Sequence, residues 1–474
     1  MTIIDIINGL KNKQFSCYEL IKFILNKIKK NNKDLNCFIT IEYKTALKEA
    51  KKYDFLRKFN QNNLLNGIPI AYKDIFCTKG IKTTCGSNFL KNFIPTYNST
   101  LIEKLKYYGF INLGKTNMDE FAMGSLNESS YFGQVKNPWN LNLVSGGSSG
   151  GSASAISAGL IPASLGTDTG GSIRLPSSYC GITGLKPTYG YLSRYGIISY
   201  SSSLDQAGPM AHTVEDCAIL LNLLSGYDKL DSTNIKLNKY NFLNYINNSI
   251  KGIKIGLPIE YLKNINSKFS CLIQDAINIY KKLGINFVDI SLPYIESAIS
   301  AYYIIVSAEA ASNLAKYDGI KYGYYKINPK SLNDLYINPR TIGFGKQVKN
   351  RIMIGTYILN NIKYFIKAKK IRNYISNNFI KIFKKVNAII IPTTKYRANK
   401  INKKNQKLNL QQDIYTISIN LAGLPVINIP IGFINKCPIG LQIITPPFTE
   451  NLLLNIAHCY QKNTNWHLNY PNIL

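Results

Sequence analysis

Residues 146–190 read GGSSGGSASAISAGLIPASLGTDTGGSIRLPSSYCGITGLKPTYG and carry the densest pattern in the chain. Two clusters of glycine and serine flank the strand-like segment LIPASLG, and a flexible linker does not return to core residues in this way. A phosphate-binding loop is also disfavoured, because the Walker pattern needs a lysine directly after its last glycine and GxGxxG is not met. The interpretation that uses all of these residues is nucleophilic catalysis by a serine.

A serine hydroxyl is a weak nucleophile and needs a neighbouring base. The chain has only three histidines, His212, His458 and His467, so a Ser-His-Asp triad or a histidine metal cluster has little to draw on. Lysine can serve as the base when burial lowers its pKa. Lys73 is the candidate, because it ends the apolar segment IPIAY and is expected at the mouth of the core. A lysine after a strand is usually a surface residue. Lys73 is singled out by its occurrence in one chain with the serine clusters GGSSGGS and TDTGGSIR.

The chain alternates helical and strand-like segments. Ser16 with Glu19, and Thr213 with Asp216, are signatures of a helix start, and each pair precedes apolar residues at helical spacing. Between them lie apolar segments of strand length, bounded by glycine, proline or asparagine: IPIAYKDIF, GFINLGKTN and LIPASLGTD. These patterns predict an α/β fold with a mixed central β-sheet between helical layers.

We expect a single domain over residues 1–474. The stretch around 226–340 is rich in lysine, asparagine and tyrosine and is a candidate peripheral insertion, although no linker rich in proline or serine separates it. A strand is predicted within it at GIKIGLP, and the core pattern returns at NAIIIPT and LPVINIPIGF.

The composition is that of a globular protein with a strong positive charge. Lysine and arginine total 57 against 26 acidic residues, which gives a net charge of +31. Such a balance suggests a nucleic-acid partner, and a basic RNA-associated protein with a decayed enzyme core is one alternative. Only seven of the 57 basic residues are arginine, and no short block concentrates the charge. A compositional bias of the whole surface is therefore the favoured interpretation.

Nine cysteines are scattered without a CxxC pair, which indicates reduced thiols rather than a zinc site or redox chemistry. No basic segment precedes the first apolar residues, so no targeting signal is expected. Residues 137–167 carry no charge, but their glycine, serine and asparagine content argues against a membrane span. We therefore expect a cytoplasmic protein without membrane contact.

Lys73 in IPIAYKD, together with the segments GGSSGGS and TDTGGSIRLPSSYCGITGLKPTYG, resembles the amidase signature family. The resemblance implies the fold of that family and its Ser-cisSer-Lys triad. Carried over position by position, Ser172 is the nucleophile, Ser148 is the cis-serine that relays a proton, and Lys73 is the base. It also implies a cis peptide bond between Gly147 and Ser148.

The same resemblance places the oxyanion of the reaction against backbone N–H groups of the nucleophile loop, namely those of Thr169, Gly170, Gly171 and Ser172. Small residues in this loop let the substrate carbonyl approach closely. Asp168 and Arg174 flank the nucleophile, and we expect them to pair and hold the loop rather than to transfer protons.

Five further segments resemble one branch of this family, the glutaminase subunits of tRNA-dependent amidotransferases. They are LGKTNMDEFAMGS (113–125), YGYLSRYGIISYSSSLDQAGPM (189–210), SAEAASNLAKYDG (307–319), GFGKQVKNRIMIGTY (343–357) and NLAGLPVINIP (420–430). The resemblance implies that the chain hydrolyses glutamine and passes ammonia to a partner B subunit, which activates Glu-tRNA(Gln) with ATP and Mg²⁺. A small C subunit would brace the chain. No cofactor is implied in the chain itself, and Glu-tRNA(Gln) would be reached through the complex.

A pocket for free glutamine needs a fixed cation for the α-carboxylate and a fixed anion for the α-ammonium group. Arg351 and Asp413 stand at the matching positions, and a planar guanidinium suits a carboxylate because it forms two parallel hydrogen bonds. A structural ion pair is the alternative role of these two residues. The resemblance adds Ser125, and one of the adjacent Tyr302 and Tyr303, as weaker contacts without choosing between the tyrosines.

A free-standing amidase acting on small acyl or aryl amides is the main rival hypothesis, and the two charged residues would then be structural. The chain also departs from the usual pattern of the family. Asn350 and His212 stand where arginine is usual, and Gln347 stands where glutamate is usual. The segment 397–412 is diverged. None of these departures touches the triad.

Overall fold

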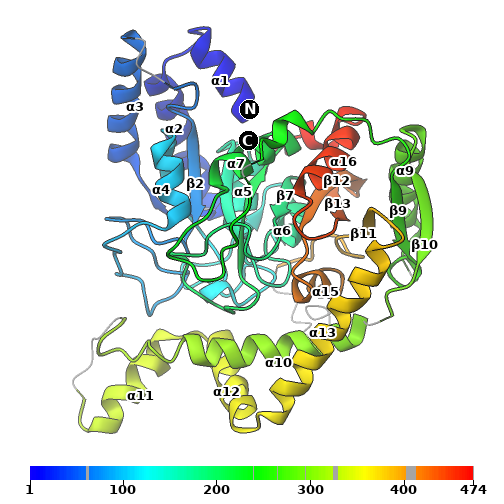
Figure 1. Ribbon diagram of the computed structural model, residues 1–474. Coiled ribbons are helices and arrows are strands. Elements are labelled where there is room, and N and C mark those ends of the chain that lie inside the picture. The colour runs from blue at the N-terminus through cyan, green and yellow to red at the C-terminus, as the bar shows by residue number, and fades with distance from the viewer. Residues whose placement is uncertain are drawn as a thin grey trace.

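Figure 1 shows the computed structural model of the chain, which describes residues 1–472 apart from 60–62, 239, 264, 294, 324–328 and 402–412. Within the described residues eleven strands form one sheet. In spatial order they are β1 (Phe38–Ile41), β3 (Ile111–Thr116), β2 (Pro69–Lys73), β6 (Ala163–Asp168), β8 (Gln206–Ala211), β7 (Thr183–Lys186), β12 (Val426–Ile434), β13 (Cys437–Ile444), β11 (Ala388–Pro392), β9 (Lys254–Pro258) and β10 (Asn286–Ile290). Strands β4 (Lys136–Asn137) and β5 (Asn140–Val144) form a separate hairpin.

The sheet is mixed. Strand β2 is parallel to both β3 and β6, whereas β6, β8, β7, β12 and β13 are antiparallel neighbours in turn. At the far edge β11, β9 and β10 are parallel again. The predicted α/β fold with a mixed central sheet is therefore confirmed, and the strands expected at IPIAY, INLGKT, ASLGTD, KIGLP, AIIIP and VINIPIGFI are all present.

Helices flank the sheet (Figure 1). They are α1 (Ile3–Lys11), α2 (Cys17–Leu35), α3 (Tyr43–Lys58), α4 (Thr100–Tyr107), α5 (Gly150–Ser157), α6 (Arg174–Cys180), α7 (Val214–Leu224), α8 (Ile259–Leu262), α9 (Ser267–Lys282), α10 (Ile295–Asn313), α11 (Leu332–Gly343), α12 (Lys346–Asn360), α13 (Lys363–Phe383), α15 (Ile414–Leu421) and α16 (Glu450–Lys462), with short 3₁₀ turns η1 (Glu120–Ala122), η2 (Phe242–Asn244) and η3 (Trp466–Leu468).

The helix starts follow the predicted capping residues. The Ser16 hydroxyl accepts a hydrogen bond from the Glu19 N–H, and the Glu19 carboxylate accepts one from the Ser16 N–H, which closes a capping box at the start of α2. At α7 the Thr213 hydroxyl accepts from the Asp216 N–H. These caps satisfy N–H groups that have no partner inside the helix.

Helix α5 is built from small residues because it is packed on every side. All eight of its residues, GGSASAIS, are buried, and it packs against α6 and against the strands β2 and β6. A Cβ atom on Gly151 would lie 2.4 Å from the backbone oxygen of Asn117 and 2.6 Å from that of Cys37, so a larger residue has no room there.

The stretch 226–340 supplies the sheet edge formed by β9 and β10 and the long helix α10. Helices α10 to α13 form a layer along one side of the molecule, at the bottom of Figure 1, in which α10 packs against α12, α13 and α15. Residues of α10 and α12 from this layer, Tyr302, Tyr303 and Arg351, line one pocket with Ser172.

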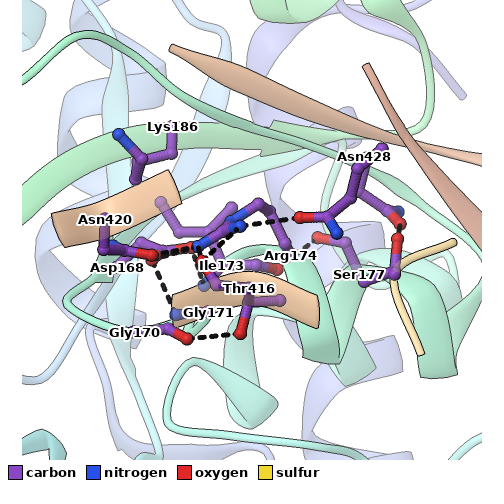
Figure 2. Close-up of polar contacts among 12 residues, drawn as sticks. Asp168, Gly170, Gly171, Ile173, Arg174, Ser177, Lys186, Thr416, Asn420 and Asn428 are labelled. Atoms are coloured by element: carbon purple, nitrogen blue, oxygen red, sulfur yellow. Dashed lines mark hydrogen bonds and ion pairs between the residues drawn. The ribbon is translucent and has the colours of Figure 1, made fainter. Parts of the chain in front are cut away.

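A buried ion pair joins β6 to α6. Arg174 is fully buried, and its Nε donates to Asp168 Oδ2 at 3.0 Å (Figure 2). Its other nitrogens donate to acceptors on β13 and α15, namely Gln442 Oε1, the Thr416 backbone oxygen and Asn420 Oδ1. Although burial alone raises the pKa of Asp168, the adjacent guanidinium holds that pKa well below its usual range. The predicted pairing of Asp168 with Arg174 is confirmed.

Replacing Arg174 by alanine should therefore be strongly destabilising. The buried Asp168 carboxylate would lose its counter-ion, and breaking such a pair lowers the free energy of unfolding by about 3–5 kcal/mol. Urea denaturation measures the loss. Arg397→Ala, at an exposed arginine, is the control and should change the free energy of unfolding by less than about 0.5 kcal/mol. Equal stability of the two variants would contradict this role of the pair.

Candidate active site

Lys73 lies at the end of β2 with no exposed surface. Its ammonium nitrogen donates to three hydroxyl groups, those of Ser148 at 2.7 Å, Thr167 at 2.9 Å and Ser149 at 3.0 Å. Within the described ranges no carboxylate oxygen lies within 4 Å of this nitrogen. A buried lysine surrounded by hydroxyls is suited to lose its proton, because burial disfavours the charged form and no adjacent anion restores it.

Burial lowers the pKa of Lys73 to about 7. The carboxylates of Asp119, Asp168 and Asp205, which lie farther away, oppose this effect without outweighing it. A substantial fraction of Lys73 is therefore neutral near pH 7, which is the condition for a general base.

The segment around Ser148, which we call the cis-serine loop, connects Lys73 to the nucleophile loop. The peptide bond between Gly147 and Ser148 is cis, as the resemblance implied. Ser148 follows this bond and accepts the hydrogen bond from Lys73, and the N–H of the next residue, Ser149, donates to the backbone oxygen of Ser172 at 3.1 Å. The structure thus brings Lys73, Ser148 and Ser172 together from three separate segments of the chain.

Asp168 shapes the nucleophile loop. Its carboxylate accepts hydrogen bonds from the N–H groups of Gly171 at 2.8 Å and Ile173 at 3.1 Å, on either side of Ser172 (Figure 2). This corrects one sequence prediction, because the Gly171 N–H is bound to Asp168 instead of pointing to an oxyanion. Gly171 has a φ of +137°, a value that glycine adopts readily, and this backbone turns its N–H toward the carboxylate. Thr169, Gly170 and Ser172 remain the predicted donors.

A small pocket opens in front of Ser172. Of the predicted site residues, those that line it are Ser125, Gly170, Gly171, Ser172, Tyr302, Tyr303, Arg351 and Asp413. A second hollow of about 770 Å³, which we call the outer cavity, adjoins it and shares Ser125, Tyr303 and Arg351 with it. The structure therefore places every predicted substrate contact at one pocket with the nucleophile.

Arg351 reaches this pocket from α12. Its guanidinium lies over the rings of Tyr303 at 5.2 Å and Tyr200 at 5.7 Å from the ring centroids, and cation–π contacts of this kind orient it. Its Nε is buried without a hydrogen-bond partner, and among the described residues no carboxylate oxygen lies within 4 Å of the guanidinium. A guanidinium whose buried Nε has no partner is ready to receive an anionic group.

Asp413 provides the opposite charge. Its carboxylate accepts hydrogen bonds from Ser125 Oγ at 2.9 Å and from Tyr303 Oη at 3.1 Å. Burial raises the pKa of Asp413 to about 6, despite these bonds and the nearby Arg351. Asp413 is therefore ionised at the pH at which Lys73 becomes neutral. Asp413 and Arg351 do not form a direct ion pair, which goes against the alternative that they exist to bind each other.

The two tyrosines, between which the sequence did not choose, have different surroundings. Both line the pocket, but only Tyr303 among them donates to Asp413. The Tyr302 hydroxyl packs on the nucleophile loop, where a Cβ atom on Gly170 would lie 2.4 Å from its oxygen.

Sequence reasoning missed three residues of this site. Ser149 and Thr167 give no obvious signal as single residues, yet their hydroxyls complete the shell around the Lys73 nitrogen. Asp205 accepts from Thr169 Oγ1 at 2.6 Å and from the N–H groups of Tyr200 and Ser201, and so ties the nucleophile loop to the pocket wall. The second serine of GGSSGGS, directly after Ser148, was the one clue available.

Within the part of the chain that the structure describes, no group of three or more histidine, cysteine, aspartate or glutamate side chains is arranged to hold a metal ion. None of the described helices is long and apolar enough to cross a membrane. The nine cysteines are free thiols, and seven of them are buried.

The fold thus brings a buried lysine and two serine segments together beside one pocket. The amidase family model matches residues 19–454, and the chain belongs to this family, as the sequence resemblance predicted. Over 478 aligned residues the chain is 50% identical to the A subunit of the glutamyl-tRNA(Gln) amidotransferase of Coxiella burnetii, with 100% of this chain and 99% of that protein covered.

Solved structures agree with this relationship. The crystal structure of the A subunit of the glutamyl-tRNA(Gln) amidotransferase from Thermotoga maritima is similar with a TM-score of 0.83 and 36% identity, covering 100% of this chain and 98% of that one. The native peptide amidase from Stenotrophomonas maltophilia is similar with a TM-score of 0.86 and 26% identity, covering 98% and 97%.

The pKa of Lys73 leads to a test of its role as the base. Amide hydrolysis should rise with pH along one limb centred at about pH 7, because the neutral form increases through the pKa of Lys73. Lys73→Ala should remove the activity as completely as loss of the nucleophile, since groups that act as a unit fail together. Steady-state rates across pH measure both effects.

Lys186 is the matched control, because burial lowers the pKa of this lysine to about 7 as well. It donates to the backbone oxygens of Pro187 and Leu424 and does not line the pocket. Lys186→Met should keep the pH limb. A limb that disappears in this variant, or a Lys73→Ala variant with about a tenth of the activity, would exclude Lys73 as the base.

Proposed function

We propose that the chain is the glutaminase component, the A subunit, of a glutamyl-tRNA(Gln) amidotransferase. The observation that carries this proposal is the pocket in front of Ser172, which holds one cation, Arg351, and one anion, Asp413, without a direct bond between them. Free glutamine carries one carboxylate and one ammonium group on its α-carbon. A pocket with both charges fixed therefore selects a zwitterionic amide over a neutral one.

The reaction proceeds in two halves. Ser172 Oγ attacks the side-chain carbonyl carbon of glutamine, and its proton passes through Ser148 Oγ to neutral Lys73 Nζ. The carbonyl oxygen becomes an oxyanion, which backbone N–H groups of the nucleophile loop stabilise. The proton returns by the same route to the amide nitrogen, the C–N bond breaks, and ammonia leaves. Water then attacks the glutamyl ester with the same residues, and glutamate and free Ser172 result.

The ammonia serves a second reaction outside this chain. Glu-tRNA(Gln) is activated with ATP and Mg²⁺ by a partner B subunit, and ammonia converts the activated glutamyl group to the glutaminyl one. A C subunit braces the assembly. The chain itself needs no cofactor, because the hydrolysis of glutamine is neither a redox nor a group-carrier reaction. The relatives named as amidotransferase subunits support this assignment.

A free-standing amidase is the second candidate, because the chain also resembles the solved peptide amidase. In that case small acyl or aryl amides without α-groups would be the substrates, and glutamine would be a poor one. The two functions share the triad and differ in what they require of Arg351 and Asp413.

Ser172→Ala should abolish ammonia release from glutamine, because it removes the oxygen that attacks the amide. The rest of the side chain is kept, so the fold should be unchanged. Transfer of an amide to Glu-tRNA(Gln) by the assembled complex should survive when an ammonium salt is supplied, since the activation chemistry lies in the B subunit. Ammonia release and Gln-tRNA formation are the two measurements.

Ser157→Ala is the control for this variant, because Ser157 is another buried serine of the same region and its hydroxyl has no partner among the described residues. It should leave both reactions unchanged. Hydrolysis of glutamine at a near wild-type rate by Ser172→Ala would contradict the assignment of the nucleophile.

Arg351→Ala and Asp413→Ala should each lower kcat/KM for glutamine roughly a hundredfold. Removing one partner of a desolvated charge pair costs about 2–5 kcal/mol, and 1.4 kcal/mol is about tenfold. A small amide without α-charges should be affected much less, because it makes neither contact. Parallel kinetics on glutamine and on such an amide measure the contrast. Equal losses on both substrates would favour the free-standing amidase.

A further inference from the structure

Glu120 caps helix α12 from outside that helix. Its side chain is buried, and its Oε2 accepts a hydrogen bond from the Gly345 N–H at 2.9 Å. Gly345 is the N-cap of α12 and has no side chain to satisfy the first N–H groups of the helix. A Cβ atom on Gly345 would lie 2.3 Å from Glu120 Oε2, so the carboxylate lies directly against the N-cap residue and accepts the N–H of that residue. A carboxylate there also matches the positive end of the helix dipole.

A second hydrogen bond fixes this carboxylate. The Ser87 hydroxyl donates to Glu120 Oε1 at 2.5 Å. Helix α12 packs along α10 and also contacts η1, the turn that Glu120 begins. Glu120 therefore fastens the start of α12 to the part of the chain that carries the triad.

The two elements that Glu120 joins lead to the two charged contacts of the proposed substrate pocket, Arg351 on α12 and Asp413 at the start of α15. Helix α12 bears Arg351, which lines both the pocket and the outer cavity. On the other side, η1 leads into Ser125, whose hydroxyl donates to Asp413 at 2.9 Å. The contact between α12 and η1 therefore links Arg351 to the Ser125 hydroxyl that holds Asp413.

We infer that Glu120 is a positioning residue for glutamine, because it sets the distance between Arg351 and the Ser125–Asp413 pair. This inference rests on the proposed function of the pocket. Glu120 touches neither the triad nor the reacting amide. Its loss should weaken the binding of a substrate that uses both charges and leave the chemical step unchanged.

Aromatic contacts also hold the start of α12. Phe344, next to the cap, stacks on Phe89 with centroids 4.5 Å apart and meets Phe121 edge-on at 5.7 Å. This aromatic cluster holds the start of α12 without Glu120. A variant at Glu120 should therefore fold and show only a looser helix start.

The test compares Glu120→Gln with wild type in the full-length chain, purified with its partner subunits. Burial raises the pKa of Glu120 to about 7, so the assays run at about pH 8, where the carboxylate is charged. The KM for glutamine should rise about fivefold, which corresponds to about 1 kcal/mol of binding free energy. Both kcat and the turnover of a neutral amide without α-groups should stay within about twofold.

Two further variants frame this result. Ser87→Ala removes the hydroxyl that donates to the Glu120 carboxylate and should raise the KM for glutamine by a smaller factor than Glu120→Gln. Glu450→Gln is the matched control, because Glu450 is another buried carboxylate that accepts from a backbone N–H, that of Thr188 at 2.8 Å, but does not line the pocket. It should leave both kinetic constants unchanged.

An unchanged KM in Glu120→Gln would overturn the inference while the proposed function stands. Equal losses of kcat on glutamine and on the neutral amide would also overturn it, because they would show general damage to the site. A wild-type complex that turns over the neutral amide but not glutamine would overturn the proposed function and this inference with it.

Discussion

The burial of Lys73 is the constraint on which the rest of the site depends. A lysine at the end of a fully buried strand loses hydration, and here its nitrogen meets the hydroxyls of Ser148, Ser149 and Thr167 instead of a carboxylate. Desolvation then lowers its pKa to about 7 and leaves much of it neutral. A chain with three histidines can thus supply a base at neutral pH, provided that the packing around β2 excludes water.

The charge of Arg174 complements this arrangement. Asp168 lies on the strand beside β2, and an unpaired carboxylate there would raise the pKa of Lys73 further. Arg174 engages Asp168 instead, and Asp168 in turn holds the N–H groups on both sides of the nucleophile. The buried ion pair therefore fixes the geometry of the nucleophile loop, and Arg174 neutralises the charge of Asp168. The small residues around Ser148 and at the start of α5 follow from the same close packing, as the lack of space at Gly151 shows.

The two charged residues of the pocket come from a different part of the fold. Arg351 lies on α12 and Asp413 at the start of α15, and the long helix α10 packs against both helices. Under the proposed function, the layer formed by α10 to α13 and the start of α15 supply the charges that select the amide. Glu120 links this layer to the catalytic segment through the N-terminus of α12. Amidases with one triad can acquire different substrates when such a layer changes, because the chemistry and the selection occupy separate elements.

The sequence by itself determined the α/β class, most of the core strands and the helix caps at Ser16 and Thr213, because periodicity and capping are local. The roles of Lys73, Ser148 and Ser172 came from the resemblance to the amidase family, and they stay a prediction. The sequence could not determine that the Gly171 N–H binds Asp168, that Thr167 and Ser149 surround Lys73, or which tyrosine meets Asp413. Each of these facts joins segments far apart in the chain, and side-chain contacts across such distances leave no local pattern. Only the tertiary structure brings Arg351 and Asp413 to one pocket without a direct bond between them, because the packing of their helices sets their separation.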